Sequence, residues 1–191
     1  MTKGRDSGMP VAEQWESYFD VAAILDSLGC PHVSGDVIEF GCGYGTFTIP
    51  LAQTIPGTVY TFDIDPLMVS TTASRVSRAQ LKNVIVEERD FVAQGCGRAD
   101  QSASWVLLFN ILHIEDPVDL LQEARRVLCR RGLAGIIHWN YDERTPRGPS
   151  LEIRPRPEQC RAWGEEAGLQ WVRDAELRGS RWHWGMVLQR L

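Results

Sequence analysis

The sequence predicts an α/β fold: a doubly wound, mostly parallel seven-stranded sheet that ends in an antiparallel C-terminal β-hairpin. Short apolar runs alternate with stretches of helical periodicity over residues 36–139, the pattern of a parallel sheet covered by helices on both faces. The last two predicted strands are joined by only residues 178–181, whereas a parallel crossover needs about a dozen residues or more. These two observations set the fold class and place the hairpin at the end of the chain.

The predicted elements begin with an amphipathic helix and then alternate between strand and helix. Asp65 and Asp116 each stand directly before a proline, which marks the N-cap and the first residue of two helices. Gly132 follows two arginines and is predicted to cap the C-terminus of the second of these helices. The predicted strands are 36–40, 58–63, 84–88, 104–110, 133–139, 169–177 and 182–191, and the predicted helices are 11–28, 45–54, 66–79, 117–130 and 157–167.

Length and composition describe one globular domain. We expect a flexible N-terminus over residues 1–10 and a single domain over residues 11–191. The net charge of −5 disfavours binding to a nucleic-acid backbone, and no apolar run approaches the roughly 20 residues of a membrane helix. The first ten residues lack the apolar stretch of a secretory signal, and the five scattered cysteines fit reduced thiols. The chain is therefore expected to be cytoplasmic and to bind neither nucleic acid nor membrane.

The most informative segment follows the first predicted strand. Gly41, Gly43 and Gly45 stand at every second position between this strand and a stretch of helical periodicity. A glycine turn of this kind opens a nucleotide-binding βαβ unit, because it lets a ligand approach the backbone closely. A dinucleotide site would carry Gly-x-Gly-x-x-Gly, but Thr46 stands where the third glycine belongs. Glu39, at the strand end, suits instead a positively charged ligand, such as an amino group beside a sulfonium.

This pattern resembles motif I of the class I, seven-β-strand S-adenosylmethionine-dependent methyltransferases, in the small-molecule branch with the type 11 and type 25 domains. Four motifs in the expected order extend the resemblance over roughly residues 35–140. It implies a Rossmann-like fold, with S-adenosylmethionine as methyl donor and S-adenosylhomocysteine as product. It also implies that Asp63 binds the ribose hydroxyls and that Asp90 contacts the adenine amino group. The cofactor-binding residues that it implies are Glu39, Gly41, Cys42, Gly43, Asp63, Ile64, Asp90, Phe91 and Asn110.

The histidines divide into one candidate for catalysis and three with weaker claims. His113 follows the fourth predicted strand, at the carboxyl edge where open α/β sheets bind ligands, and is the candidate catalytic base. His138 lies near the end of the fifth strand, where its side chain belongs either to the core or to the pocket. We expect no chemical role for His32 or His183. No histidine is spaced from Cys, Asp or Glu as metal ligands are, so no metal is expected.

The methyl acceptor is indicated mostly by motifs that are missing. No Asn-Pro-Pro-Tyr sequence stands at Asn110 and no Pro-Cys dipeptide occurs, which disfavours methylation of nucleobases and of glutamine side chains. The resemblance to the small-molecule branch implies a small-molecule acceptor. The leading helix is expected to fold over the pocket with Tyr18 lining the acceptor cavity, although its aromatic side chains could equally pack as core. Trp139 is a second candidate for substrate binding. The loop over residues 140–156 carries four arginines, of which Arg147 is the candidate for holding an anionic acceptor.

Two other functions stay open on the sequence alone. One is a regulatory or accessory protein that binds S-adenosylmethionine without acceptor chemistry, and the other is a nucleotide-dependent oxidoreductase with a degenerate glycine loop. The identity of a ligand retained through purification would separate the oxidoreductase from the other two. Formation of S-adenosylhomocysteine would separate an enzyme from a sensor. The accepting atom and the oligomeric state are not indicated by any motif.

Overall fold

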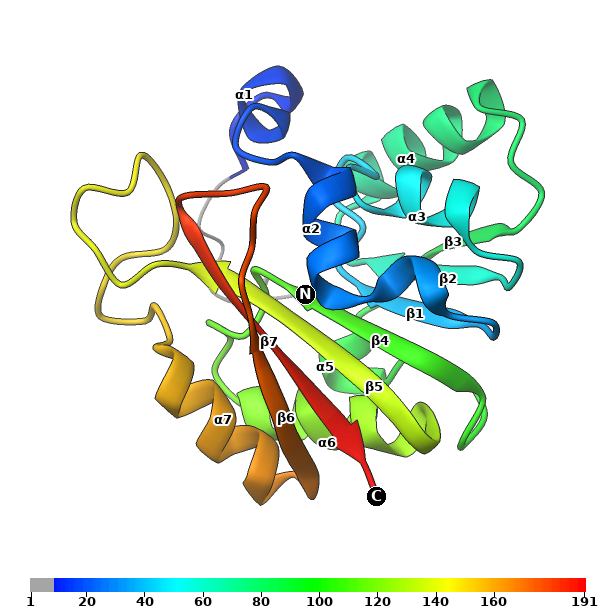
Figure 1. Ribbon diagram of the computed structural model, residues 1–191. Coiled ribbons are helices and arrows are strands. Elements are labelled where there is room, and N and C mark those ends of the chain that lie inside the picture. The colour runs from blue at the N-terminus through cyan, green and yellow to red at the C-terminus, as the bar shows by residue number, and fades with distance from the viewer. Residues whose placement is uncertain (1–8) are drawn as a thin grey trace.

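The computed structural model describes residues 9–191 and contains one seven-stranded sheet (Figure 1). The strands are β1 (Val37–Phe40), β2 (Val59–Asp63), β3 (Val84–Glu88), β4 (Ala103–Phe109), β5 (Leu128–Trp139), β6 (Leu169–Ala175) and β7 (His183–Arg190). Their order across the sheet is β3-β2-β1-β4-β5-β7-β6. The first five strands are parallel, and β7 pairs antiparallel with both β5 and β6. The predicted fold class, including its antiparallel end, is confirmed.

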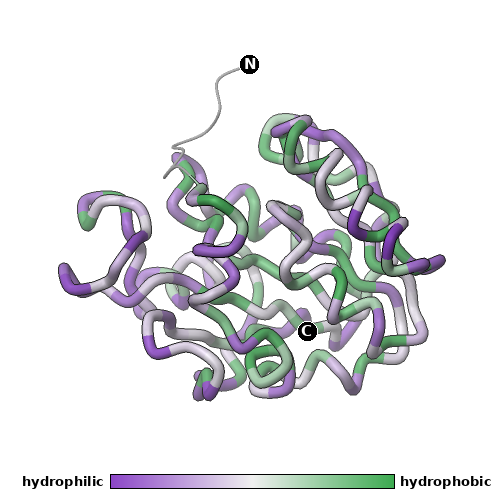
Figure 2. Tube along the Cα trace, turned by 90° about the horizontal axis from the view of Figure 1, so that it is seen from above, coloured by the Kyte–Doolittle hydropathy of each residue, from purple (hydrophilic) through white to green (hydrophobic). Residues whose placement is uncertain are grey.

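Helices cover both faces of the sheet. Figure 1 shows α2, α3 and α4 grouped on one side and α5, α6 and α7 on the other. In Figure 2 the chain that crosses the middle of the molecule is largely green, whereas purple stretches are common in the outer loops. The helices are α1 (Ala12–Glu16), α2 (Val21–Leu28), α3 (Thr48–Thr54), α4 (Pro66–Arg78), α5 (Phe91–Gln94), α6 (Pro117–Val127) and α7 (Pro157–Glu166), with a 3₁₀ turn at Cys30–His32.

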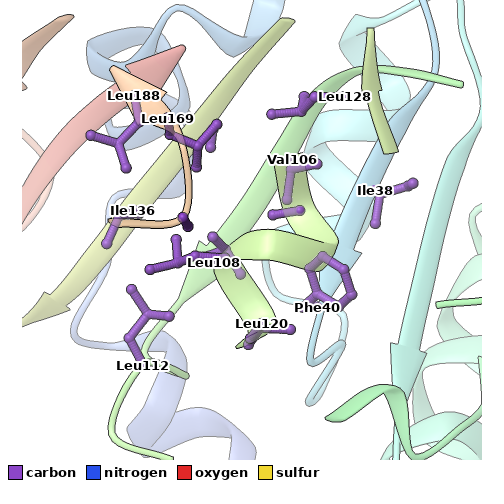
Figure 3. Close-up of a cluster of buried hydrophobic side chains, with 14 of the residues drawn as sticks. Ile38, Phe40, Val106, Leu108, Leu112, Leu120, Leu128, Ile136, Leu169 and Leu188 are labelled. Atoms are coloured by element: carbon purple, nitrogen blue, oxygen red, sulfur yellow. The ribbon is translucent and has the colours of Figure 1, made fainter. Parts of the chain in front are cut away.

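Successive strand residues supply two separate hydrophobic cores, because side chains alternate between the faces of a strand. In β4, Val106 and Leu108 point to the core under α6, whereas Trp105 and Leu107 point to the core under α2 and α3. Figure 3 shows the first core, where strand residues meet Leu120 of α6. Both cores pack against the strands of the sheet, and the carboxyl ends of the parallel strands lie at one edge. In the described part of the chain, no helix is long and apolar enough to cross a membrane.

The leading helix is broken, which corrects the prediction of one helix over 11–28. It forms α1 and α2, separated by residues 17–20, because the carboxylate of Asp20 accepts a hydrogen bond from the Ala23 amide at 3.2 Å and so caps a new helix. The helix predicted over 45–54 also starts later, at Thr48, since Gly45 has a φ of +74° that no helix accommodates. The predicted flexible N-terminus falls mostly on residues 1–8, which lie outside the described residues.

The prediction that Gly132 caps a helix ending at 130 is wrong. Helix α6 ends at Val127 and β5 begins directly with the buried Leu128, so Gly132 lies inside a strand. The last carbonyl groups of α6 are satisfied from far away in sequence. Arg190 donates from Nη1 to the carbonyl oxygens of Arg125, Arg126 and Leu128 at 2.9, 3.0 and 2.7 Å. This guanidinium replaces the glycine cap as the donor to these carbonyls.

The two predicted N-caps differ. Asp65 caps α4, because its carboxylate accepts a hydrogen bond from the Leu67 amide at 2.9 Å. Asp116 makes no such bond at the start of α6, so proline alone marks that helix start. A short helix that the sequence did not predict, α5, follows β3. Its N-cap is Asp90, whose carboxylate accepts a hydrogen bond from the Ala93 amide at 3.0 Å.

Candidate active site

A cavity of about 590 Å³ opens at the carboxyl ends of the parallel strands. It lies where the strand order reverses between β1 and β4, the position at which open α/β sheets bind ligands. The cavity brings together all nine residues predicted to bind the cofactor and three of the four predicted for catalysis or substrate. These twelve are Glu39, Gly41, Cys42, Gly43, Asp63, Ile64, Asp90, Phe91, Asn110, His113, Trp139 and Arg147.

The glycine turn is folded so that its backbone forms one wall of the cavity. The amides of Gly41 and Cys42 both donate to the carbonyl oxygen of Phe62 at 2.9 Å, which ties the turn to β2. Gly43 has a φ of +50° and lines the cavity. Gly45 does not line it. A Cβ added there would lie 3.1 Å from the side chain of Thr72 in α4, so this glycine allows close helix packing.

Asp63 holds the turn from the end of β2. One carboxylate oxygen accepts from the Gly43 amide at 2.9 Å, and the other accepts from the Asp65 amide at 3.0 Å. Burial raises the pKa of Asp63, and the two backbone bonds oppose that effect. Asp63 does not cap the next helix, because Asp65 caps α4. The Asp63 carboxylate is therefore both a part of the turn and a part of the cavity wall.

Glu39 lies beneath the turn and is only 3% exposed. Its Oε2 accepts hydrogen bonds from the hydroxyl groups of Thr48 and Thr61 at 2.5 and 2.7 Å. Burial raises the pKa of Glu39 to about 7, the two threonines oppose this rise, and the charge of Asp63 adds to it. The two threonines were not predicted, because nothing in their local sequence pattern links them to Glu39.

Two buried polar side chains of the cavity lack hydrogen-bond partners among the described residues. Both the oxygen and the nitrogen of the Asn110 carboxamide are buried and unpaired, and so is the hydroxyl of Thr46. Asn110 has a φ of +54°, and its amide donates to the carbonyl of Ile137 at 2.8 Å, which fixes the residue. An unpaired buried polar group costs about 1–3 kcal/mol, so polar groups of a ligand in the cavity would stabilise the protein by pairing with these side chains. Thr46 was missed as a site residue, although its place in the glycine turn was the available signal.

The histidines take different positions relative to the cavity. His113 lines the cavity, and its Nδ1 is 3.3 Å from Nε2 of His138. His138 is fully buried and does not line the cavity, so its side chain belongs to the core. His183 is also buried, with its ring centroid 4.1 Å from that of Trp139. Within residues 9–191, no group of three His, Cys, Asp or Glu side chains is arranged to hold a metal ion.

The N-terminal segment contributes Met9, Pro10 and Trp15 to the cavity wall. Tyr18, predicted to line the acceptor cavity, is not among the lining residues. Its ring instead packs edge-on against Trp139 with centroids 5.4 Å apart. Because α1 ends at Glu16, Tyr18 lies beyond the helix, and Trp15 takes the predicted place in the wall.

The segment is fastened to the glycine turn and to α4. The hydroxyl of Tyr44 donates to the carbonyl of Pro10 at 2.9 Å. Arg75 of α4 donates to the carbonyl of Tyr44 at 3.0 Å and forms an ion pair with Glu16. These contacts hold α1 beside the cavity.

The loop after β5 uses its four arginines for different purposes. Arg144 is exposed and pairs with Asp142, and Arg156 lies over the Tyr141 ring at 3.9 Å. Arg154 is 7% exposed and donates to main-chain carbonyls of its own loop. Of the four, Arg147 alone lines the cavity described here. The structure therefore brings only this arginine to the site.

Comparisons with known proteins agree with this arrangement. The sequence pattern of the methyltransferase domain family matches residues 37–132. The fold is similar to that of a SAM-dependent methyltransferase from Aquifex aeolicus, with 23% identity, a TM-score of 0.81 and 94% of each chain covered. It is also similar to the N,N-8-amino-8-demethyl-D-riboflavin dimethyltransferase RosA from Streptomyces davawensis, with 16% identity, a TM-score of 0.74, and 94% of this chain and 56% of RosA covered. A search among curated proteins finds no match.

Proposed function

The chain belongs to the methyltransferase domain family, and we propose that it transfers the methyl group of S-adenosylmethionine to a small-molecule acceptor by in-line displacement. It is an S-adenosylmethionine-dependent enzyme. The observation that carries the proposal is the unpaired, buried Asn110 carboxamide in the same cavity as the carboxylates of Glu39 and Asp63. Together they offer hydrogen-bond donors, acceptors and negative charge to one ligand.

The residues of the cavity fit this methyl donor. Asp63 and Asp90 would accept hydrogen bonds from its ribose and adenine groups, the carboxylate of Glu39 would face positive charge, and Asn110 would gain a partner. When bound, S-adenosylmethionine supplies an electrophilic methyl group, and the electron pair of the broken carbon–sulfur bond stays on sulfur. The protein's main contribution is to orient the acceptor, and orientation can supply about 7–11 kcal/mol in the best intramolecular cases.

The rest of the cavity wall would hold the acceptor. Trp15 and Trp139 provide aromatic surface, with ring centroids 6.3 Å apart, and Arg147 provides a guanidinium. His113 would accept the proton that an acceptor hydroxyl or amine loses when its electron pair forms the new bond to carbon. Formation of S-adenosylhomocysteine tests the enzyme directly, because a regulatory protein that only binds the donor would not form it. The family match gives no support to the oxidoreductase alternative.

Replacing Asp63 with alanine is expected to weaken the binding of S-adenosylhomocysteine by about 1.5–3 kcal/mol, because hydrogen bonds to a charged group are lost. Isothermal titration calorimetry measures the effect, and NAD should show no binding to either protein. The matched control is Asp36→Ala, which removes a carboxylate that accepts from the Thr58 amide at 2.8 Å, outside the cavity wall. Unchanged affinity in Asp63→Ala would mean that the ribose is held by another residue.

Replacing Arg147 with alanine is expected to raise the KM for an anionic acceptor by about 10- to 100-fold, since a charge-assisted hydrogen bond contributes about 1.5–3 kcal/mol. The affinity for S-adenosylmethionine should change little. The measurement follows S-adenosylhomocysteine formation with a panel of carboxylate, phosphate and neutral acceptors. Arg144→Ala is the control, because Arg144 lies in the same loop with its side chain 86% exposed. Equal losses for both substrates would assign Arg147 a structural role.

A further inference from the structure

A histidine of the cavity wall contacts a second histidine in the core. His113 follows β4 and lines the cavity, whereas His138 lies in β5 and is 0% exposed. Nδ1 of His113 and Nε2 of His138 are 3.3 Å apart, and the two ring planes are inclined by 79°. This is a hydrogen bond between two imidazoles, so one nitrogen must donate and the other must accept.

The surroundings of His138 keep its ring neutral. Burial is the largest cause that lowers the pKa of His138 well below its ordinary value, and the charges of His113, His183 and Arg154 lower it further. One face of the ring is stacked on Trp184, with centroids 6.3 Å apart. The lowered pKa of His138 therefore disfavours a second proton on that ring.

We propose that His138 is a positioning residue that holds His113 in the tautomer with hydrogen on Nδ1. In this tautomer Nδ1–H of His113 donates to Nε2 of His138, and Nε2 of His113 carries a lone pair. The other tautomer would place hydrogen on Nε2 of His113 and leave no lone pair there. The inference rests on the proposed function, in which His113 accepts the proton of the acceptor.

The histidine pair provides a place for the proton that the acceptor loses during methyl transfer. The proton of the acceptor hydroxyl or amine moves to Nε2 of His113, and the electron pair it leaves behind forms the bond to the methyl carbon. The imidazolium that results still donates Nδ1–H to His138, so the same hydrogen bond serves both charge states of His113. The imidazolium then returns its Nε2 proton to water. A neutral partner allows this return, because it adds no buried negative charge that would retain the proton.

The test is the tautomer of His113, which needs no methyl acceptor. Protein labelled with nitrogen-15 histidine is saturated with S-adenosylhomocysteine, and long-range proton–nitrogen correlation spectra report which ring nitrogen carries hydrogen. In the wild-type protein we expect hydrogen on Nδ1 of His113 alone. In His138→Phe we expect a mixture of both tautomers. In His138→Gln, whose amide oxygen can accept a hydrogen bond, we expect the Nδ1–H form to return.

The matched control is His183→Gln, which removes a second buried histidine whose hydrogen bond is to Ser180. It should leave the His113 tautomer unchanged. Hydrogen on Nε2 of His113 in the wild-type protein would overturn the proposal, and so would a single unchanged tautomer in His138→Phe. If His138→Phe does not fold, the wild-type and His138→Gln spectra still decide. Failure of methyl transfer itself would appear only as absent S-adenosylhomocysteine formation, so the two failures are distinguishable.

Discussion

Replacing Glu39 with glutamine is expected to stabilise the ligand-free protein by about 3 kcal/mol at about pH 8, while weakening its affinity for the methyl donor. Burial raises the pKa of Glu39 from 4.5 to about 7, so at higher pH the folded protein contains a buried carboxylate. One pKa unit corresponds to about 1.4 kcal/mol. Glutamine keeps the shape and the hydrogen bonds to the threonine hydroxyls without the charge.

The raised pKa of Glu39 determines how the stability of the wild-type protein changes with pH. Between pH 4.5 and about 7 the unfolded chain has lost the Glu39 proton while the folded protein retains it, so stability falls as the pH rises. The groups that face Glu39 are Thr48 from α3, Thr61 in β2 and Asp63 at the end of β2. Urea unfolding of the two proteins should therefore give equal stability below pH 4.5 and the largest difference above pH 7.

The substitution Glu39→Gln should weaken ligand binding although it stabilises the ligand-free protein. The positively charged donor favours the ionised carboxylate, so Glu39→Gln is expected to weaken S-adenosylmethionine binding by about 2 kcal/mol, roughly 30-fold. Glu123→Gln is the matched control, because its hydrogen bond with Arg126 lowers the pKa of Glu123 to about 2. Glutamine at 123 should reduce stability above pH 4.5, where Glu123 is ionised. A Glu39→Gln protein that is less stable than the wild type at high pH would contradict the prediction.

Replacing Arg154 with methionine is expected to lower the free energy of unfolding by about 3 kcal/mol, because several hydrogen bonds from one buried guanidinium are lost. Arg154 donates to the carbonyl oxygens of Pro149 and Asn140 at 2.7 and 2.9 Å, and to the Thr145 hydroxyl at 2.6 Å. These bonds fold the loop over 140–156 into a compact turn. Gly148 packs against Trp139 in this turn, where a Cβ would lie 2.8 Å from the indole.

Hydrogen exchange and limited proteolysis across residues 140–156 would locate the loss of order. Arg154→Lys should recover little stability, since an ammonium cannot reproduce the planar fork of donors. Arg144→Met is the control, and it should change stability by less than about 0.5 kcal/mol because exposed ion pairs contribute little. An Arg154→Met protein with wild-type stability and an equally protected loop would show that the hydrogen bonds to Arg154 are dispensable.

The part of the site that is built from residues close together in the sequence could be predicted. The glycine turn and the Asp63 position follow from local spacing, because a strand, a turn and a helix must succeed one another to build the wall of the cavity. The missing hydrogen-bond partners of the Asn110 carboxamide could not be predicted. They depend on the backbone conformation of this residue, which has a φ of +54°, and on what surrounds its side chain in the fold. The His113–His138 contact likewise joins residues 25 positions apart, one in the segment after β4 and one in β5.

The sequence singled out Arg147 as the arginine for the acceptor, but it could not predict what Arg144 and Arg154 do in the same loop. Their roles depend on burial: one is exposed, one lines the cavity and one is enclosed by carbonyl groups. The helix end at Val127 was mispredicted for a similar reason. Its carbonyl groups are bound by Arg190, more than 60 residues later, and no local pattern reports a donor so distant.

The position of β7 constrains how the nascent chain folds on the ribosome. β7 lies between β5 and β6 although it is synthesised after both, so β6 cannot join the sheet until residues 183–190 have emerged. Until then β5 presents an open edge beside the apolar residues Ile136 and Ile137, and the end of α6 lacks Arg190. Unpaired edges of this kind aggregate or recruit chaperones. Nascent chains stalled before residue 183 are therefore expected to be protease-sensitive and bound by chaperones, whereas chains stalled well beyond residue 190 are expected to be compact.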